Sequence, residues 1–140
     1  MRKMENGDYV KIQGHLCKIV DSNNTPPIVF DYNVRQRITG KLIRCNIVIN
    51  EDVLCNCCGF QKTNSQYIIT HLHDNTSYFV IRYETTPIKG RCYIDICGQM
   101  HTIISEHRII VLSVLQDFVR NHTGCELNIN TECLISLLQR

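Results

Sequence analysis

The hydrophobic pattern of this chain changes its period near residue 104, and this change constrains the fold more than any other feature. Before residue 104, short β-branched or aromatic runs alternate with turn residues, which is the pattern of strands. These runs cover residues 9–12, 16–20, 27–32, 42–49, 67–70, 78–83 and 92–97. Beyond residue 104, apolar residues recur at steps of three and four, which is typical of amphipathic helices. The sequence therefore predicts an α+β fold with strands first and helices last.

The first predicted helix begins at Ser105, which is a plausible N-cap, and ends at Arg120, shortly before Gly124. A second, shorter helix follows, capped by Asn130 or Thr131. Apolar residues cover more than half of the circumference of the first helix, and one sheet covers only one side of a helix. We therefore expect this helix to bind a protein partner or a second copy of the chain as well as to pack on the core.

Length and composition limit the remaining possibilities. The chain has 140 residues, of which 44% are hydrophobic, so one domain over residues 1–140 is expected, β-rich to residue 104 and helical over 105–140. No run approaches the ~18 apolar residues of a membrane span, and the N-terminus shows no secretory signal. We therefore expect an intracellular protein, in the nucleus or cytoplasm, that is not secreted and not in a membrane.

The charges are interleaved along the chain, with a formal net charge of +2. The one local basic cluster consists of Arg35, Arg37, Lys41 and Arg44. Phosphate affinity scales with the number of neutralised charges, so this cluster alone is a modest binding site. The sequence does not predict nucleic acid as the primary partner.

Nine cysteines are the most unusual feature of the composition. In a reducing compartment, cysteines are metal ligands, reactive thiols or small core residues more often than disulfides. Cys55 and Cys58 form a C-x2-C pair, the spacing at which one tight turn directs two thiolates at one ion, and Gly59 suits such a turn. His71 follows twelve residues after Cys58.

Further candidate ligands lie downstream. His73 would project to the same face of a strand as His71, and Cys92 and Cys97 follow later in the chain. A tetrahedral Zn²⁺ site drawn from Cys55, Cys58, His71, His73, Cys92 and Cys97 is therefore predicted. The alternative is that these thiols are buried in an apolar core, as is expected of Cys17 and Cys133.

Residues 45–101 resemble known zinc modules. The order C-x2-C, H-x-H and then a late Cys/His group is similar to a RING or U-box cross-brace. The chain also has no alanine, 19 isoleucines and 12 asparagines, a bias typical of AT-rich genomes such as those of large DNA viruses. Together these features resemble the small RING/U-box-like zinc proteins of insect DNA viruses. The resemblance implies a structural zinc, a protein-binding role and a place in nucleocapsid or virion assembly.

Three classes of function are compatible with these patterns. The first is a non-enzymatic, zinc-binding interaction or assembly protein, which the sequence favours. The second is a ubiquitin-pathway adaptor of the RING/U-box type. The third is a thiol hydrolase resembling the H-box/NC type, in which His15 would pair with Cys133.

Overall fold

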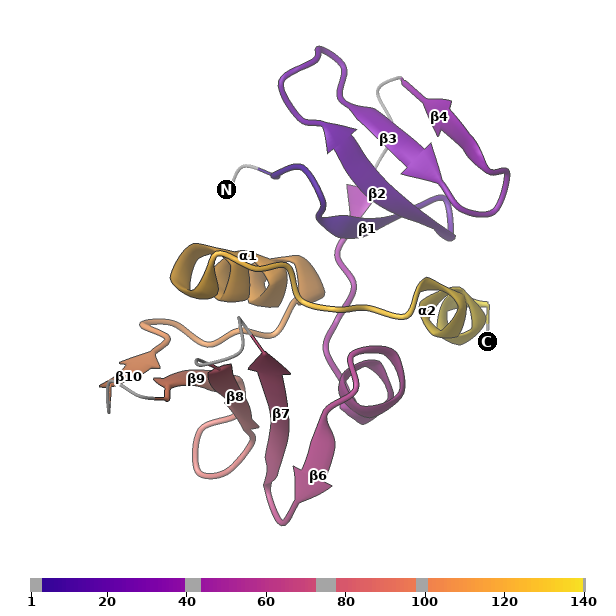
Figure 1. The fold of residues 1–140 in the computed structure, drawn as a ribbon. Coiled ribbons are helices and arrows are strands. Elements are labelled where there is room, and N and C mark those ends of the chain that lie inside the picture. The colour runs from indigo at the N-terminus through magenta and orange to yellow at the C-terminus, as the bar shows by residue number, and fades with distance from the viewer. Residues whose placement is uncertain (1–3, 40–43, 73–77, 98–100, 140) are drawn as a thin grey trace.

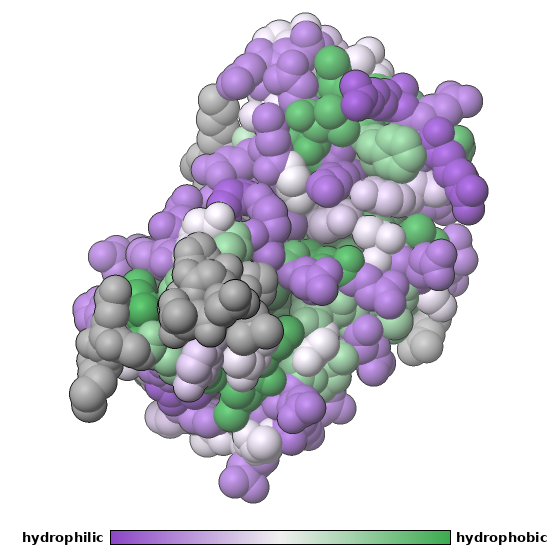
Figure 2. All heavy atoms as spheres, viewed as in Figure 1, coloured by the Kyte–Doolittle hydropathy of each residue, from purple (hydrophilic) through white to green (hydrophobic). Residues whose placement is uncertain are grey.

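The protein is described by a computed structural model that covers residues 4–39, 44–72, 78–97 and 101–139. Two antiparallel sheets enclose a layer of helices (Figure 1). The fold is thus mixed α+β and mostly β, as the sequence predicts. On the face shown in Figure 2, hydrophilic side chains surround small groups of hydrophobic ones.

The N-terminal sheet contains the first five strands in the order β4-β3-β2-β1-β5. Its strands are β1 (Tyr9–Ile12), β2 (His15–Asp21), β3 (Ile28–Asp31), β4 (Gln36–Ile38) and β5 (Arg44–Cys45). One face of the sheet encloses a small apolar cluster of Val10, Ile12, Cys17, Ile19 and Val29. The opposite face directs Tyr9 and Leu16 into the large core that the helices share.

The C-terminal sheet contains the other five strands in the order β10-β9-β8-β7-β6. Its strands are β6 (Gln61–Thr63), β7 (Gln66–Leu72), β8 (Tyr78–Glu84), β9 (Arg91–Ile96) and β10 (His101–Ile104). Alternate residues of β8 and β9 are buried, among them Ile81, Tyr83, Cys92 and Ile94. The sheet therefore packs one face on the core and leaves the other in solvent, as antiparallel sheets commonly do.

Three helical segments complete the fold: the π-helix η1 (Val53–Cys57), α1 (Leu112–Thr123) and α2 (Thr131–Leu138). Helix α1 lies between the two sheets (Figure 1), where Leu112, Leu115 and Val119 are buried. Leu112, Leu115 and Val119 are thus covered within the chain, whereas Val114 and Phe118 are half-buried. Binding of a partner protein or of a second copy by this helix stays a prediction. No helix in the described part of the chain is long and apolar enough to cross a membrane.

The C-terminal end of α1 and the N-terminal end of α2 lie where the sequence predicts them. Gly124 closes α1 in the left-handed conformation, at φ 72°, and its N–H donates to the carbonyl of Arg120. The side chain of Asn130 caps α2 by accepting from the N–H of Cys133 at 3.0 Å.

The prediction that the first helix begins at Ser105 is wrong, because α1 begins at Leu112. Residues 105–111 instead form backbone hydrogen bonds with other segments. The N–H of Ser105 donates to Cys92, and that of Ile109 donates to Gly90 at 2.7 Å. The hydroxyl of Ser105, expected to cap a helix, accepts from the N–H of Cys92. Tertiary hydrogen bonds here override the helical period of the side chains.

The strand predicted over residues 42–49 is also shorter than expected. Within the described residues, only β5 belongs to the sheet, and Val48 forms an isolated antiparallel bridge with Val111. This bridge links the chain between the two sheets to the segment that precedes α1. One pairing therefore accounts for both the short strand and the late start of the helix.

Candidate functional site

The predicted C-x2-C turn is the π-helix η1. The side chain of Asn50 begins it by accepting from the N–H of Val53 at 2.9 Å, and the N–H of Cys58 donates to the carbonyl of Val53 at 3.0 Å. This bond spans five residues, which defines the wider turn of a π-helix. Gly59, at φ 79°, then lets the chain leave towards β6.

The two thiols of this turn have different surroundings. Cys55 is partly exposed, and its ionisable neighbours are Glu51, Lys62 and Asp52. Cys58 is buried in the large apolar core, where burial raises the pKa of its thiol to about 12. A protonated, buried thiol behaves as a small apolar side chain.

The remaining predicted ligands lie on the C-terminal sheet. Cys92 pairs with Tyr83 and is fully buried, and burial raises the pKa of its thiol to about 12. Cys97 lies after β9, next to Tyr78. His71 belongs to β7 and pairs with Phe79 through the backbone, and its side chain is not among the described atoms. His73 lies outside the described residues.

Within residues 4–39, 44–72, 78–97 and 101–139, no group of three or more His, Cys, Asp or Glu side chains forms a metal site. Cys55 and Cys58 have different ionisable neighbours, and Cys92 lies inside the core. Zinc binding by these residues stays a prediction.

His15 and Cys133, the predicted pair for thiol catalysis, have separate neighbours. Nδ1 of His15 lies 2.8 Å from Oδ2 of Asp31 in the N-terminal sheet. Cys133 instead neighbours Cys57, where burial and the adjacent Cys133 thiol raise the pKa of the Cys57 thiol to about 12. In the described part of the chain, no interaction joins His15 to Cys133.

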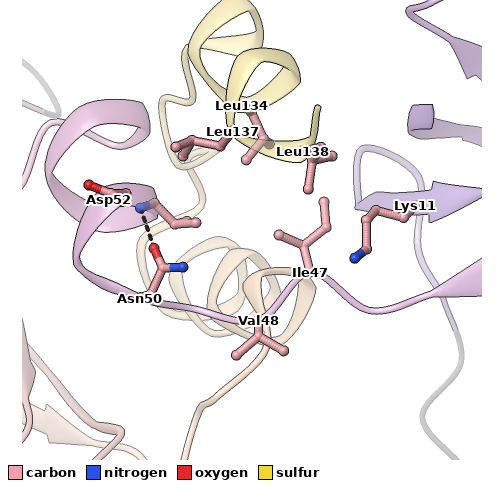
Figure 3. A pocket seen from close by; sticks show the side chains of 9 residues that line it. Lys11, Ile47, Val48, Asn50, Asp52, Leu134, Leu137 and Leu138 are labelled. Carbon is pink, nitrogen blue, oxygen red and sulfur yellow. Dashed lines mark hydrogen bonds between the residues drawn. The ribbon is translucent and has the colours of Figure 1, made fainter. Parts of the chain in front are cut away.

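Beside η1 lies a groove of about 280 Å³ that opens to solvent (Figure 3). It is lined by Lys11, Ile47, Val48, Asn50, Asp52, Val53, Leu134, Leu137 and Leu138. In Figure 3, the leucines of α2 form one wall and Ile47 reaches towards Leu138. Six of the nine lining residues are aliphatic, but Ile47, Val53 and Leu134 are buried, so Val48, Leu137 and Leu138 supply the accessible apolar lining beside polar groups.

Charged side chains stand at the two ends of this groove. Lys11, on β1, lies at one end, and Asp52, before η1, lies at the other end beside Asn50 (Figure 3). Neither Lys11 nor Asp52 forms an ion pair with another described residue. The groove therefore offers a positive end and a negative end that remain available to a ligand.

The backbone along the groove is also available. The N–H of Ile49 donates to Ile110 at 2.9 Å, and the N–H of Leu112 donates to Ile47 at 2.8 Å. These two bonds lie on either side of Val48 and Val111, which makes them a non-hydrogen-bonded pair of an antiparallel ladder. In such a pair, the N–H and C=O of Val48 point away from Val111. Neither group has a hydrogen-bond partner among the described residues, and Val48 is 63% exposed.

Few features of the sequence indicate this groove. Leu134, Leu137 and Leu138 are recognisable as one face of a short helix. Ile47 and Lys11, however, come from distant segments whose meeting depends on the Val48–Val111 bridge.

No family model, curated protein or solved structure matches this chain. Its function must therefore be inferred from its own geometry.

Proposed function

We propose that this chain is a non-enzymatic interaction module that binds an extended peptide segment of a partner protein in the groove between β1, η1 and α2. The observation that carries the proposal is that Val48 lines the groove while its N–H and C=O have no hydrogen-bond partner among the described residues.

An extended peptide can add to such an edge as a further strand. Its main-chain groups then bond to the N–H and C=O of Val48, and every second side chain points towards the protein. The half-buried side chains of Leu137 and Leu138 suit one apolar side chain of the peptide. Main-chain bonds thus supply affinity, and the groove supplies specificity.

The two charges define the ends of the ligand. An acidic residue of the peptide is favoured near Lys11, and a basic residue is favoured near Asp52. Because Lys11 and Asp52 lie at opposite ends of the groove, they also favour one of the two directions in which the bound peptide can run. The expected partner is therefore an extended segment with an apolar centre and opposite charges at its ends.

The thiols support a non-enzymatic role. The thiolate is the nucleophile in cysteine chemistry, and burial raises the pKa of Cys57, Cys58 and Cys92 to about 12 each. A structural zinc and a place in nucleocapsid or virion assembly, which the family resemblance implies, remain predictions about the same interaction role.

The proposal is tested with a fluorescein-labelled peptide of about seven residues, built of threonine and valine around a central leucine. It carries glutamate at one end and lysine at the other, in both chain directions, and its binding is followed by fluorescence anisotropy. One direction should bind more tightly than the other. Methylation of the backbone nitrogens that face the protein should abolish binding, because it removes the main-chain donors.

Protein variants locate the site. Lys11→Glu should weaken binding roughly tenfold and should recover it with a peptide whose glutamate is replaced by lysine. Leu138→Glu should abolish binding, whereas Ile88→Glu, an exposed apolar position on the β8–β9 loop, should leave it unchanged. Equal binding by the N-methylated peptide, or equal losses at Leu138 and Ile88, would rule out strand addition in this groove.

A further inference from the structure

The N-terminal sheet carries a row of side chains that the groove does not use. Tyr9 pairs with Lys18, Lys18 pairs with Phe30, and Phe30 pairs with Arg37 across four neighbouring strands. Residues directly opposite one another in a sheet project to the same face. Tyr9, Lys18, Phe30 and Arg37 therefore form one continuous row in which aromatic and basic side chains alternate.

The aromatic rings of this face contact one another. The ring of Tyr32 lies 4.9 Å from that of Phe30 in an edge-on arrangement and 6.1 Å from that of Tyr9. Tyr9 is buried beneath the helices, whereas Phe30 and Tyr32 are half-buried. Phe30 belongs to neither apolar cluster of the described residues. Its ring is thus a surface feature that the core does not require.

The basic side chains of the row are not neutralised. Among the described residues, neither Lys18 nor Arg37 has an acidic partner. The ammonium of Lys18 lies 5.6 Å from the centre of the Tyr9 ring, and Arg37 is exposed. Both charges are available to an anionic ligand.

The surrounding sequence strengthens this positive character. Residues 1–50 contain eight Lys or Arg and four Asp or Glu. Residues 51–140 contain seven Lys or Arg and nine Asp or Glu. Two of the four acidic residues, Glu5 and Asp8, bind Arg120 of α1, and a third, Asp31, binds His15. These carboxylates are therefore engaged elsewhere and do not balance the charge of the row.

The C-terminal sheet provides an informative contrast. Arg82 lies over the ring of Tyr93, its cross-strand neighbour, at 4.7 Å. This pair resembles the Lys18–Phe30–Arg37 row, but Nε of Arg82 also lies 3.0 Å from Oδ2 of Asp95. A cation already bound by a carboxylate is a poorer ligand for phosphate. In the N-terminal sheet, by contrast, the half-buried rings of Phe30 and Tyr32 lie beside Lys18 and Arg37, which have no acidic partner among the described residues.

We propose that the exposed part of this row, Lys18, Phe30 and Arg37, binds single-stranded nucleic acid together with Tyr32. Bases stack on the rings of Phe30 and Tyr32, and the phosphates between them contact Lys18 and Arg37. An aromatic platform beside basic side chains is the usual design of sequence-tolerant single-strand binding. Stacking needs unpaired bases, so a duplex offers the row only its phosphates.

This site lies on a different part of the sheet from the peptide groove, and its test is independent. A fluorescein-labelled oligothymidylate of about twelve nucleotides is titrated with the full chain, and anisotropy is recorded at several salt concentrations. A duplex of equal length and a labelled polyglutamate serve as competing probes. The single strand should bind most tightly, and its affinity should fall as salt rises.

Matched variants separate the row from general charge effects. Lys18→Gln and Arg37→Gln should each reduce the slope of log affinity against log salt by ~0.7, the value expected for one single-strand phosphate contact. Phe30→Leu should weaken binding about 5- to 100-fold at constant charge, because it removes a stacking surface. Arg82→Gln and Tyr93→Leu, which change the neutralised pair of the other sheet, should leave binding unchanged.

Several outcomes would overturn the proposal. One is polyglutamate binding as tightly as the single strand with no effect of Phe30→Leu, which would identify an acidic protein partner instead. Another is an equal loss from the Lys18 and Arg82 variants, which would show non-specific attraction. Because Arg37 is exposed and outside both cores, the Arg37→Gln variant tests the proposal even if Phe30→Leu lowers stability.

Discussion

The side-chain oxygen of Gln116 accepts a hydrogen bond from the backbone N–H of Tyr9 at 2.9 Å. The amide nitrogen of Gln116 also donates to the carbonyl of Gly7 at 2.8 Å. Gln116 is only 2% exposed, so one buried amide on α1 satisfies two backbone groups at the start of β1. This contact fixes the N-terminal sheet on the helix layer.

Gln116→Leu should therefore destabilise the fold, although leucine has a similar size and is apolar. The variant leaves the N–H of Tyr9 and the carbonyl of Gly7 buried without their partner, at a cost of about 2–4 kcal/mol. Urea unfolding measures this loss, and Gln61→Leu, at an exposed position on β6, is the control. A loss below about 0.5 kcal/mol at Gln116 would show that water or a shift of β1 replaces the amide.

Asp95 makes stability depend on pH. Burial by itself raises the pKa of this carboxyl, but hydrogen bonds from Thr102 and Arg82, with the charge of Arg82, outweigh burial and lower it. A lowered pKa in the folded state stabilises the fold above the unfolded value of about 4, and this contribution is lost as pH falls through the folded value.

Asp95→Asn should therefore lower the free energy of unfolding at neutral pH, and its difference from the wild-type chain should shrink as the pH falls below about 4. Thr102→Val, which removes the 2.7 Å hydrogen bond from the threonine hydroxyl, should give a smaller loss with the same pH dependence. Urea titrations between pH 7 and pH 3 measure both. A difference that stays constant with pH would assign the loss to packing rather than to charge.

The sequence predicted strands wherever a run alternates between buried and exposed residues, as in β1 and β8. It did not reveal β4 or β6, because Gln36 and Arg37 in β4 and all three residues of β6 are polar and exposed at a sheet edge. Edge strands of this kind carry no hydrophobic period. The helix start at Leu112 was equally hidden, since it depends on backbone bonds to distant segments.

The candidate site was harder to predict than the fold. The spacing of Cys55 and Cys58 marked a chemically unusual turn, but spacing does not tell which way each thiol points or how deeply it lies. Cys92 was predicted to be a metal ligand because it is a cysteine. The register of β9, however, places it in the core opposite Tyr83. The Phe30–Arg37 row depends on strand register, which the sequence alone does not fix.

Cysteine variants distinguish a packed turn from a zinc site. With the packing described, Cys58→Ala should cost about 1–2 kcal/mol through the cavity it leaves, and Cys55→Ala, at a partly exposed position, should cost less. Thermal unfolding and elemental analysis of protein purified without added zinc measure the two effects. Large, equal losses, accompanied by loss of about one zinc per chain, would instead establish the predicted metal site, because metal-binding free energy is then folding free energy.

The last prediction concerns the close approach of two backbone segments at Gly90. Gly90 has φ 91°, and a Cβ added there would lie 2.9 Å from the carbonyl oxygen of Ile109. That oxygen cannot move easily, because it accepts a 2.7 Å hydrogen bond from the hydroxyl of Tyr83, and the N–H of Ile109 donates to Gly90. Gly14 is a matched control, since it has φ 80° but no atom within 4 Å of an added Cβ.

Gly14→Ala should cost about 1–2 kcal/mol, the strain of a positive φ for an L-residue. Gly90→Ala should cost the same strain and, in addition, about 1–3 kcal/mol for displacing the segment that leads into α1. Urea unfolding of both variants measures the difference between them. Equal losses of unfolding free energy in the two variants would mean that the backbone of Ile109 moves without an energetic cost. The hydrogen bonds of Ile109 to Tyr83 and Gly90 would then not be what keeps residues 105–111 out of the helix that their sequence favours.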